Sequence, residues 1–285
     1  AVSTYSVTDT DSGDTFSWSL TGDDASQFII SDSGELTFKS APDFETPGSA
    51  TSSNAYSVTL TATDAGGLTD STDVMVNVGD INDEAPLLNV AATSAVSIAE
   101  NTTAVAIYTV TDADAGDTLS WSLTGDDASL FDIASNGELT FKSAPDYETP
   151  GSAASSNAYS LTVSVIDSSI LYDSTDLTIN VSDVNEVPVL NVAASAAVSI
   201  AENTTAVASY TVTDPDTGDT VSWSLTGDDA SQFIINDGLL MFKYEPDYET
   251  PHGGANDDSN TYSVIVTATD AASLTDSTHL TVNVT

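Results

Sequence analysis

The sequence predicts an all-β chain that consists of three tandem β-sandwich domains. Three observations support this fold class: one segment occurs three times, apolar residues alternate with polar ones, and clusters of Gly and Asp separate the alternating runs. The repeated segment begins at Ser17, Ser120 and Ser222, and its tryptophans are 103 and 102 residues apart. Each repeat is therefore long enough to hold its own hydrophobic core.

Alternation with a period of two indicates strands, because successive side chains of a strand point to opposite faces of the sheet. In the second repeat the apolar positions are Leu119, Trp121, Leu123, Tyr159, Leu161, Val163, Val165, Leu177, Ile179 and Val181. About seven short strands in about 100 residues are typical of an immunoglobulin-like Greek-key sandwich. We expect the tryptophans to lie in the cores, and a surface platform for sugar stacking is the less favoured interpretation.

The repeat boundaries follow from two acidic junctions, Asp80 to Pro86 and Asp183 to Pro188. We predict domains at residues 1–83, 84–186 and 187–285. The second and third repeats open with Val-Ser-Ile-Ala-Glu-Asn, whereas Ala1 aligns with Ala104. We therefore expect the first repeat to lack its N-terminal strand, and the 285 residues to be a fragment of a longer array.

The composition excludes several classes of partner. The chain carries 44 Asp and Glu against 3 Lys and Arg, which gives a formal net charge of −41, and it has no Cys. A chain this acidic is unsuited to nucleic acid and to anionic membrane surfaces, which both require cationic side chains. No apolar run is long enough to span a bilayer, so we expect no direct membrane insertion. With 40% hydrophobic residues, the chain can still form packed cores.

The acidic residues occur at fixed positions of the repeats. The motifs are an opening Glu, Asp-x-Asp, Asp-aromatic-Glu, a lone Asp at the end of a strand, and the acidic junction. Ca²⁺ prefers six to eight oxygen ligands from carboxylates, carbonyls and water. One such motif is a weak signal, but five in a constant order with one period indicate calcium sites.

The order Ala-Glu-Asn, Thr-Asp-x-Asp, Asp-Tyr-Glu, a strand-ending Asp and Asp-x-Asn-Asp/Glu…Pro resembles cadherin repeats over all three units. The Ser-Leu-Thr-Gly-Asp-Asp stretch and the short second junction are most similar to the cadherin-like repeats of large bacterial adhesins. The resemblance implies an extracellular, cell-surface or secreted protein. It also implies two to three Ca²⁺ ions at each junction between successive domains.

The resemblance assigns ligands to both junctions, with Asn82 and Asn185 acting through their carbonyls. The first junction would use Asp43, Glu45, Asp80, Asn82, Asp83, Glu84, Asp112, Asp114 and Asp167. The second would use Glu100, Asp146, Glu148, Asp183, Asn185, Glu186, Asp214, Asp216 and Asp270. Glu84 stands where the family usually has Asn, and the second junction lacks this residue. The acids at the two ends of the chain, Glu202 among them, are expected to form only half sites.

The predicted function is that of a calcium-rigidified extender or cell-adhesion segment. Its partners would be calcium and either the same protein on another cell or a surface polysaccharide. A carbohydrate-binding repeat module is the alternative. An enzyme is disfavoured, because the acid pairs recur in all three repeats, no Cys nucleophile exists, and the only histidines, His252 and His279, occur in the third repeat alone.

Overall fold

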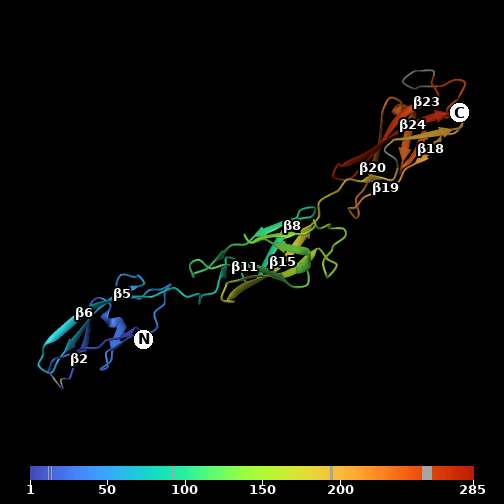
Figure 1. The fold of residues 1–285 in the computed structure, drawn as a ribbon. Helices are drawn as coiled ribbons and strands as arrows, with labels where there is room; N and C mark the ends of the chain where they lie inside the picture. The colour runs from blue at the N-terminus through green and yellow to red at the C-terminus, as the bar shows by residue number, and fades with distance from the viewer. Residues whose placement is uncertain (12, 14, 92, 193–194, 252–258) are drawn as a thin grey trace. The chain divides into compact units, whose positions relative to one another are not determined.

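The computed structural model describes all residues except 12, 14, 92, 193–194 and 252–258, so His252 lies outside the described residues. The only helices among the described residues are three 3₁₀ helices, η1 (Ala25–Gln27), η2 (Ala128–Leu130) and η3 (Ala230–Gln232). Nearly all remaining regular structure is β-strand (Figure 1), which confirms the predicted all-β fold class.

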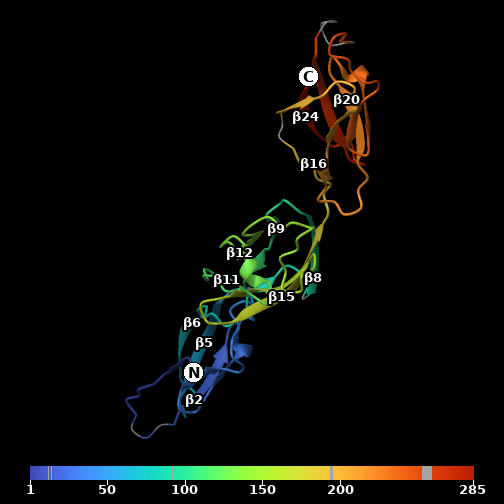
Figure 2. The ribbon, with the colours of Figure 1, turned by 90° about the vertical axis from the view of Figure 1, so that its right-hand side faces the viewer.

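The first repeat contains two three-stranded sheets. One has the strand order β2-β5-β6, with β6 at its edge (Figure 2), and the other has the order β1-β4-β3. The strands are β1 (Ser3–Thr4), β2 (Ser17–Thr21), β3 (Phe28–Ile30), β4 (Glu35–Phe38), β5 (Ala55–Thr63) and β6 (Thr69–Asn77).

The second repeat has a four-stranded sheet of order β11-β14-β15-β8, a three-stranded sheet of order β12-β13-β9 and the pair β10-β7. The four-stranded sheet therefore has one strand more than its counterpart in the first repeat. The strands are β7 (Leu87–Leu88), β8 (Thr93–Ala99), β9 (Ala104–Ile107), β10 (Val110–Thr111), β11 (Ser120–Thr124), β12 (Phe131–Ile133), β13 (Glu138–Phe141), β14 (Ala158–Ile166) and β15 (Tyr172–Ser182).

The third repeat has the same plan, with sheets of order β17-β24-β23-β20, β18-β22-β21 and β16-β19. Its opening strand β17 pairs in parallel with β24, and all its other pairings are antiparallel. The strands are β16 (Val189–Leu190), β17 (Ser195–Ile200), β18 (Ala206–Ser209), β19 (Val212–Thr213), β20 (Ser222–Thr226), β21 (Phe233–Asn236), β22 (Leu239–Phe242), β23 (Thr261–Thr269) and β24 (Thr275–Val284).

Contacts group the chain into two compact units that do not follow the repeat boundaries. The first unit comprises residues 1–96, 104–142 and 160–178, and the second comprises residues 97–103, 143–159 and 179–285. The parts of the second repeat that group with the third include its opening Glu, its Asp-Tyr-Glu motif and its acidic junction. The domain boundaries at residues 83/84 and 186/187 stay predictions.

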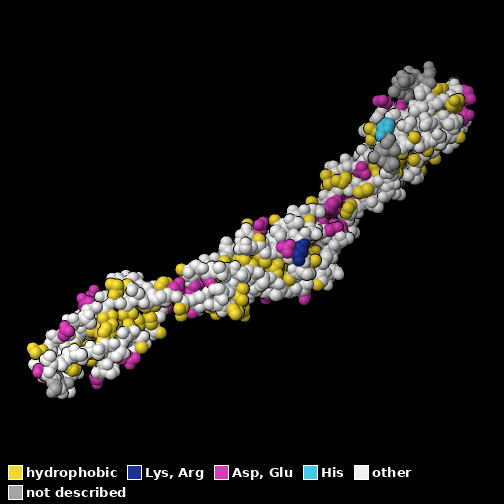
Figure 3. All heavy atoms as spheres, in the orientation of Figure 1, with side chains coloured by type: hydrophobic (Ala, Val, Ile, Leu, Met, Phe, Trp, Pro, Cys, Tyr) yellow, Lys and Arg dark blue, Asp and Glu magenta, His cyan; other side chains and the backbone are white. Residues whose placement is uncertain are grey.

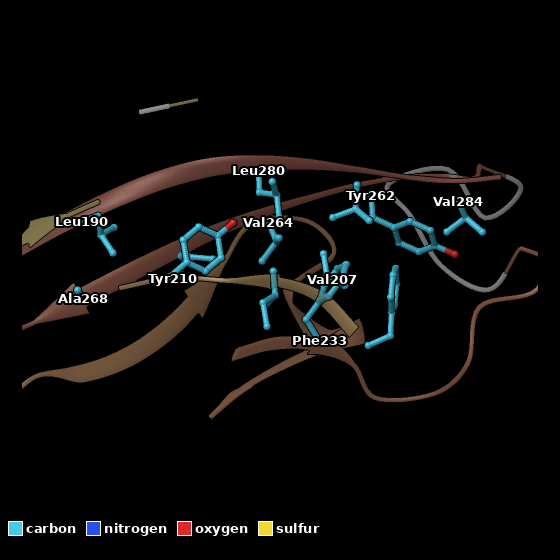
Figure 4. Packing of buried hydrophobic residues seen from close by; sticks show 13 residues of the cluster. Leu190, Val207, Tyr210, Phe233, Tyr262, Val264, Ala268, Leu280 and Val284 are labelled. Carbon is cyan, nitrogen blue, oxygen red and sulfur yellow. The ribbon is translucent and has the colours of Figure 1, made fainter. Parts of the chain in front are cut away.

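The cores consist of the alternating apolar positions. In the third repeat, Tyr262, Val264 and Leu280 are at most 2% exposed, and they lie with Phe233 between the two sheets (Figure 4). Trp223 is half-buried against this cluster, and Trp18 packs in the same way in the first repeat. Trp18 and Trp223 therefore pack against the cores, as the alternation predicts.

One acid in each repeat has a structural role that the sequence does not reveal. Asp24, Asp127 and Asp229 are at most 4% exposed, although the acid that precedes each of them is exposed. The two carboxylate oxygens of Asp24 accept hydrogen bonds from the Ala50 and Ser57 amides at 2.6 and 2.7 Å. These aspartates tie the loop before each 3₁₀ helix to the neighbouring long strand.

Candidate metal centres

The predicted ligands lie in loops that follow strands. Glu100 follows β8, Asp112 and Asp114 follow β10, Asp167 follows β14, and Asp183 follows β15. The turn after the opening Glu requires a left-handed residue, since Asn101 has φ +60°. Asn tolerates this conformation better than most residues, which explains the Glu-Asn sequence at this position.

The densest acidic cluster lies in the second unit. Carboxylate oxygens of Glu100, Glu148, Asp183 and Glu186 lie within 4.8 Å of one another. Glu100 is 2% exposed, and it accepts hydrogen bonds from the amides of Tyr147 and Val184, both at 2.8 Å. Glu100 thereby fixes the Asp-Tyr-Glu loop and the junction around one point.

A second cluster in the same unit comprises Asp214, Asp216 and Asp219, again within 4.8 Å. The Asp216 carboxylate accepts the Glu186 amide at 2.8 Å, which connects the two clusters. Asn185 donates through its side-chain amide to Asp270 at 2.8 Å. The nine predicted residues of the second junction therefore lie in one unit. Six of them are members of these two clusters, Asp270 accepts from the Asn185 side chain, and Asp146 accepts the Thr149 amide instead.

The first unit repeats this arrangement with fewer acids. Glu45, Asp83 and Asp114 form one cluster, and the Asp114 carboxylate accepts the Glu84 amide at 3.0 Å. Glu45 and Asp83 align with Glu148 and Glu186 of the second site. No described residue of the first unit takes the place of Glu100 in this cluster.

Another cluster of the first unit contains Asp112 and Asp167, which we predicted, and Asp117, which we did not. Asp117 accepts hydrogen bonds from the Ser168 hydroxyl, at 2.6 Å, and from the side-chain amide of Asn82. The alignment offers a signal for Asp117 and for Asp219: both end an Asp-x-Asp-x-Gly-Asp sequence that occurs in every repeat. The extended motif is therefore the better predictor of this cluster.

Several predicted ligands lie outside the acidic clusters of the described residues. Asp43 and Asp146 each accept the amide three residues further along at 2.8 Å and thereby stabilise their loops. Asp80 accepts the Ala115 amide at 3.3 Å. The Glu84 side chain is exposed, and only its backbone contacts Asp114.

The electrostatics of the clusters oppose ionisation. Loss of water raises the pKa of Glu45, and the nearby charges of Asp80 and Asp114 raise it further. The pKa values of Glu148, Asp183, Glu186 and Asp214 are raised in the same way, first by loss of water and then by neighbouring carboxylates. Hydrogen bonds act in the opposite direction at Asp117, whose pKa is lowered mainly by Ser168.

The clusters meet the chemical requirements of a hard divalent cation. Each holds only oxygen donors, and several buried carboxylate oxygens have no hydrogen-bond partner: Glu45 Oε1, Asp112 Oδ2, Asp114 Oδ1, Asp167 Oδ2, Glu186 Oε2, Asp214 Oδ2 and Asp219 Oδ2. Buried polar atoms without partners are uncommon in folded proteins. The three lysines are bound elsewhere, because each donates to a serine carbonyl within a 3₁₀ helix.

Comparison with solved structures identifies the fold. Mouse protocadherin-24 EC1-3 matches 100% of this chain and 93% of its own, with 22% identity and a TM-score of 0.56. Mouse cadherin-23 EC22-24 matches 97% of this chain and 89% of its own, with 25% identity and a TM-score of 0.52. A protocadherin gammaB7 EC3-6 cis-dimer structure matches 95% of this chain and 66% of its own, with 25% identity and a TM-score of 0.51. No family model matches the chain.

The chain is therefore a tandem array of cadherin-like β-sandwich repeats, as its motif order predicts. Its neighbours have an adhesion-type, structural fold rather than the fold of an enzyme. Among the described residues, no helix has the length and apolar character needed to cross a bilayer.

Proposed function

We propose that this chain is a calcium-binding segment of a cell-surface or secreted protein, in which Ca²⁺ at the junctions makes the array a rigid extender or adhesive stalk. The observation that carries this proposal is the convergence of Glu100, Glu148, Asp183 and Glu186 within 4.8 Å. In the absence of a cation, four neighbouring carboxylates repel one another. A bound Ca²⁺ supplies the positive charge that offsets this repulsion.

The residues divide into those that would bind the ion and those that position them. Glu100, Glu148, Asp183 and Glu186 would hold calcium at the second junction, and Asp214, Asp216 and Asp219 would hold it on the side of the following repeat. Asp146 and Asn101 position the loops, because Asp146 accepts the Thr149 amide and Asn101 donates to Glu186 at 3.0 Å. The raised pKa values indicate that protons compete with the metal for these oxygens.

Extracellular calcium modules bind at about 10⁻⁴ to 10⁻³ M, so a junction of this kind is ordered outside a cell and loose inside it. This range of calcium affinity suits an adhesive array whose junctions become ordered only after export. The similarity of the Ser-Leu-Thr-Gly-Asp-Asp stretch to bacterial adhesins supports a bacterial surface protein. The partner would be a second copy on another cell or a surface polysaccharide.

The test is small-angle X-ray scattering of residues 1–285 in EDTA and in millimolar calcium, combined with calorimetric titration. We expect saturable binding and a narrower distribution of dimensions in calcium. The triple variant E148Q/D183N/E186Q should lose both effects at the second junction, whereas the exposed pair D126N/D228N should retain them. Identical scattering under both conditions, with no heat of binding, would refute the proposal.

A carbohydrate-binding module is the second candidate, and the tyrosines of the Asp-Tyr-Glu loops favour it. Tyr147 and Tyr248 are 36% and 48% exposed, while their backbone atoms contact the loop. Aromatic rings in such positions can stack on sugars. A glycan array probed with the wild type and with Y147A/Y248A separates the two functions. Glycan binding by the wild type that is lost in Y147A/Y248A would support the carbohydrate-binding function.

A further inference from the structure

The tip of the β14–β15 hairpin in the second repeat differs from its counterpart in the third repeat. In the second repeat, Ser168 and Ser169 follow the strand-ending Asp167. The equivalent residues of the third repeat, between β23 and β24, are Ala271 and Ala272. A serine hydroxyl can donate a hydrogen bond, whereas an alanine side chain cannot. The two junctions therefore differ at a position next to a candidate metal ligand.

Both serines contact the first junction. The Ser168 hydroxyl donates to the Asp117 carboxylate at 2.6 Å, and the Ser169 hydroxyl donates to the Asn82 carbonyl at 3.2 Å. The Asn82 side-chain amide donates to Asp117 and, at 3.2 Å, to the Ser168 hydroxyl. These hydrogen bonds tie the junction residue Asn82 to the hairpin tip. Asn82, Asp117, Ser168 and Ser169 are called the serine latch below.

The serine latch occupies oxygen atoms of a candidate metal cluster. Carboxylate oxygens of Asp112, Asp117 and Asp167 lie within 4.8 Å of one another, and a cavity of about 210 Å³ lies beside Asn82 and Asp117. Figure 3 shows acidic side chains, in magenta, at the surface of both junctions. Asp112 and Asp167 each keep a buried oxygen without a partner. A cation can therefore bind here, but it must compete with the latch for Asp117.

The second junction has no such latch among the described residues. Asp219 is the equivalent of Asp117, and its buried Oδ2 atom has no hydrogen-bond partner. Asn185 is the equivalent of Asn82, and its side-chain amide donates instead to Asp270 and to the Glu186 carbonyl, both at 2.8 Å. The carboxylate that the serines satisfy at the first junction is thus left available to a cation at the second.

We propose that the serine latch restrains the first junction in the absence of calcium, and that it raises the calcium concentration which this junction requires by competing for Asp117 and the Asn82 carbonyl. The second part of this inference rests on the proposed calcium-binding function, whereas the restraint of Asn82 does not. The latch makes the two junctions of one chain respond differently to the same cation. Removal of calcium then leaves Asn82 held to the hairpin tip.

The calcium test compares the wild type with S168A/S169A, which introduces the residues of the third repeat. The NMR amide signals of Gly116 and Gly218, at equivalent positions of the two acidic motifs, report calcium binding at each junction separately. S168A/S169A should lower the calcium midpoint of Gly116 by at least about tenfold, because a hydrogen bond to a charged group no longer competes. The midpoint of Gly218 should not change, which also shows that the variant is folded.

A metal-free measurement separates the latch from the calcium proposal. In EDTA, ¹⁵N relaxation should give Asn82 and Asp83 order parameters near those of rigid backbone, about 0.85, in the wild type. These values should fall clearly in S168A/S169A. The matched variant S122A/S160A removes two serine hydroxyls from exposed strand positions, and it should change neither the order parameters nor the calcium midpoints.

The two measurements distinguish the possible failures. An unchanged Gly116 midpoint in S168A/S169A, with calcium bound at both junctions, would overturn the competition. Unchanged order of Asn82 in EDTA would overturn the restraint. No calcium response at Gly116 or Gly218 would overturn the proposed calcium function and the competition together, and the EDTA comparison would then decide the restraint alone.

Discussion

The buried aspartates of the Gly-Asp-Asp turns allow a sharp test, because each is adjacent to an exposed aspartate. We predict that the triple variant D24N/D127N/D229N is strongly destabilised, whereas D23N/D126N/D228N behaves like the wild type. Asp24 accepts two amides through two oxygens. An Asn side chain keeps only one acceptor and directs its amide group at the other N–H donor.

The expected magnitude follows from these contacts. A hydrogen bond to a charged group contributes about 1.5–3 kcal/mol, so each repeat should lose about 2–3 kcal/mol of unfolding free energy. With a urea dependence of about 2 kcal/mol per molar, the midpoint should fall by about 1 M. The substitutions of the exposed aspartates should change the unfolding free energy by no more than about 0.5 kcal/mol. Because all three repeats are changed together, separate unfolding transitions do not have to be assigned to individual repeats.

The assay is urea unfolding in EDTA, followed by tryptophan fluorescence, with calcium titration of both triple variants as a control. The buried aspartates lie outside the acidic clusters of the described residues, so calcium affinity should be unaffected wherever the protein is folded. If the two triple variants have equal urea midpoints, the hydrogen bonds from the two backbone amides to this aspartate make no net contribution to stability, and the reasoning would fail.

Three further predictions concern the sites and the cores. Glu100→Gln should weaken calcium binding at the second junction by roughly tenfold because it removes one ligand charge, whereas the exposed Glu138→Gln should not, as calorimetry can check. Val282→Ala, at a fully buried position, should cost about 2 kcal/mol in chemical denaturation, and Val76→Ala at the equivalent half-buried position should cost less; equal costs would contradict this reasoning. The raised pKa of Glu148 means that the metal-free folded state binds its proton more tightly than the unfolded chain does. Metal-free stability should therefore rise, and calcium affinity fall, as the pH decreases from neutral towards the ordinary glutamate pKa of 4.5; calcium affinity that is constant over this range would contradict it.

The predictions that depended on local sequence were confirmed. Alternation identified the strands and their core faces, as the burial of Tyr159, Leu161, Val163 and Val165 shows. Side-chain direction along a strand is fixed by covalent geometry, so an apolar pattern of period two needs no tertiary information. The threefold repetition likewise gave the number of similar units and the resemblance to cadherin repeats directly.

The acidic residues show what local sequence could not determine. Asp23 and Asp24 are neighbours with the same chemistry, yet one is exposed and the other accepts two backbone amides in the interior. Asp117 was overlooked, and Glu84, which the motif included, has an exposed side chain. Whether a carboxylate is shielded from solvent depends on whether loops from distant parts of the chain pack against it.

The sequence by itself therefore determined the repeats, the strands and the order of the acidic motifs, because these depend on spacing along the backbone. Only the tertiary structure decided which carboxylates converge and which ones accept buried backbone amides. Those outcomes depend on contacts between residues such as Glu100 and Val184, 84 positions apart. The excess of acid that first excluded nucleic acid and membranes thus divides into candidate ligands, structural acceptors and a solvated surface.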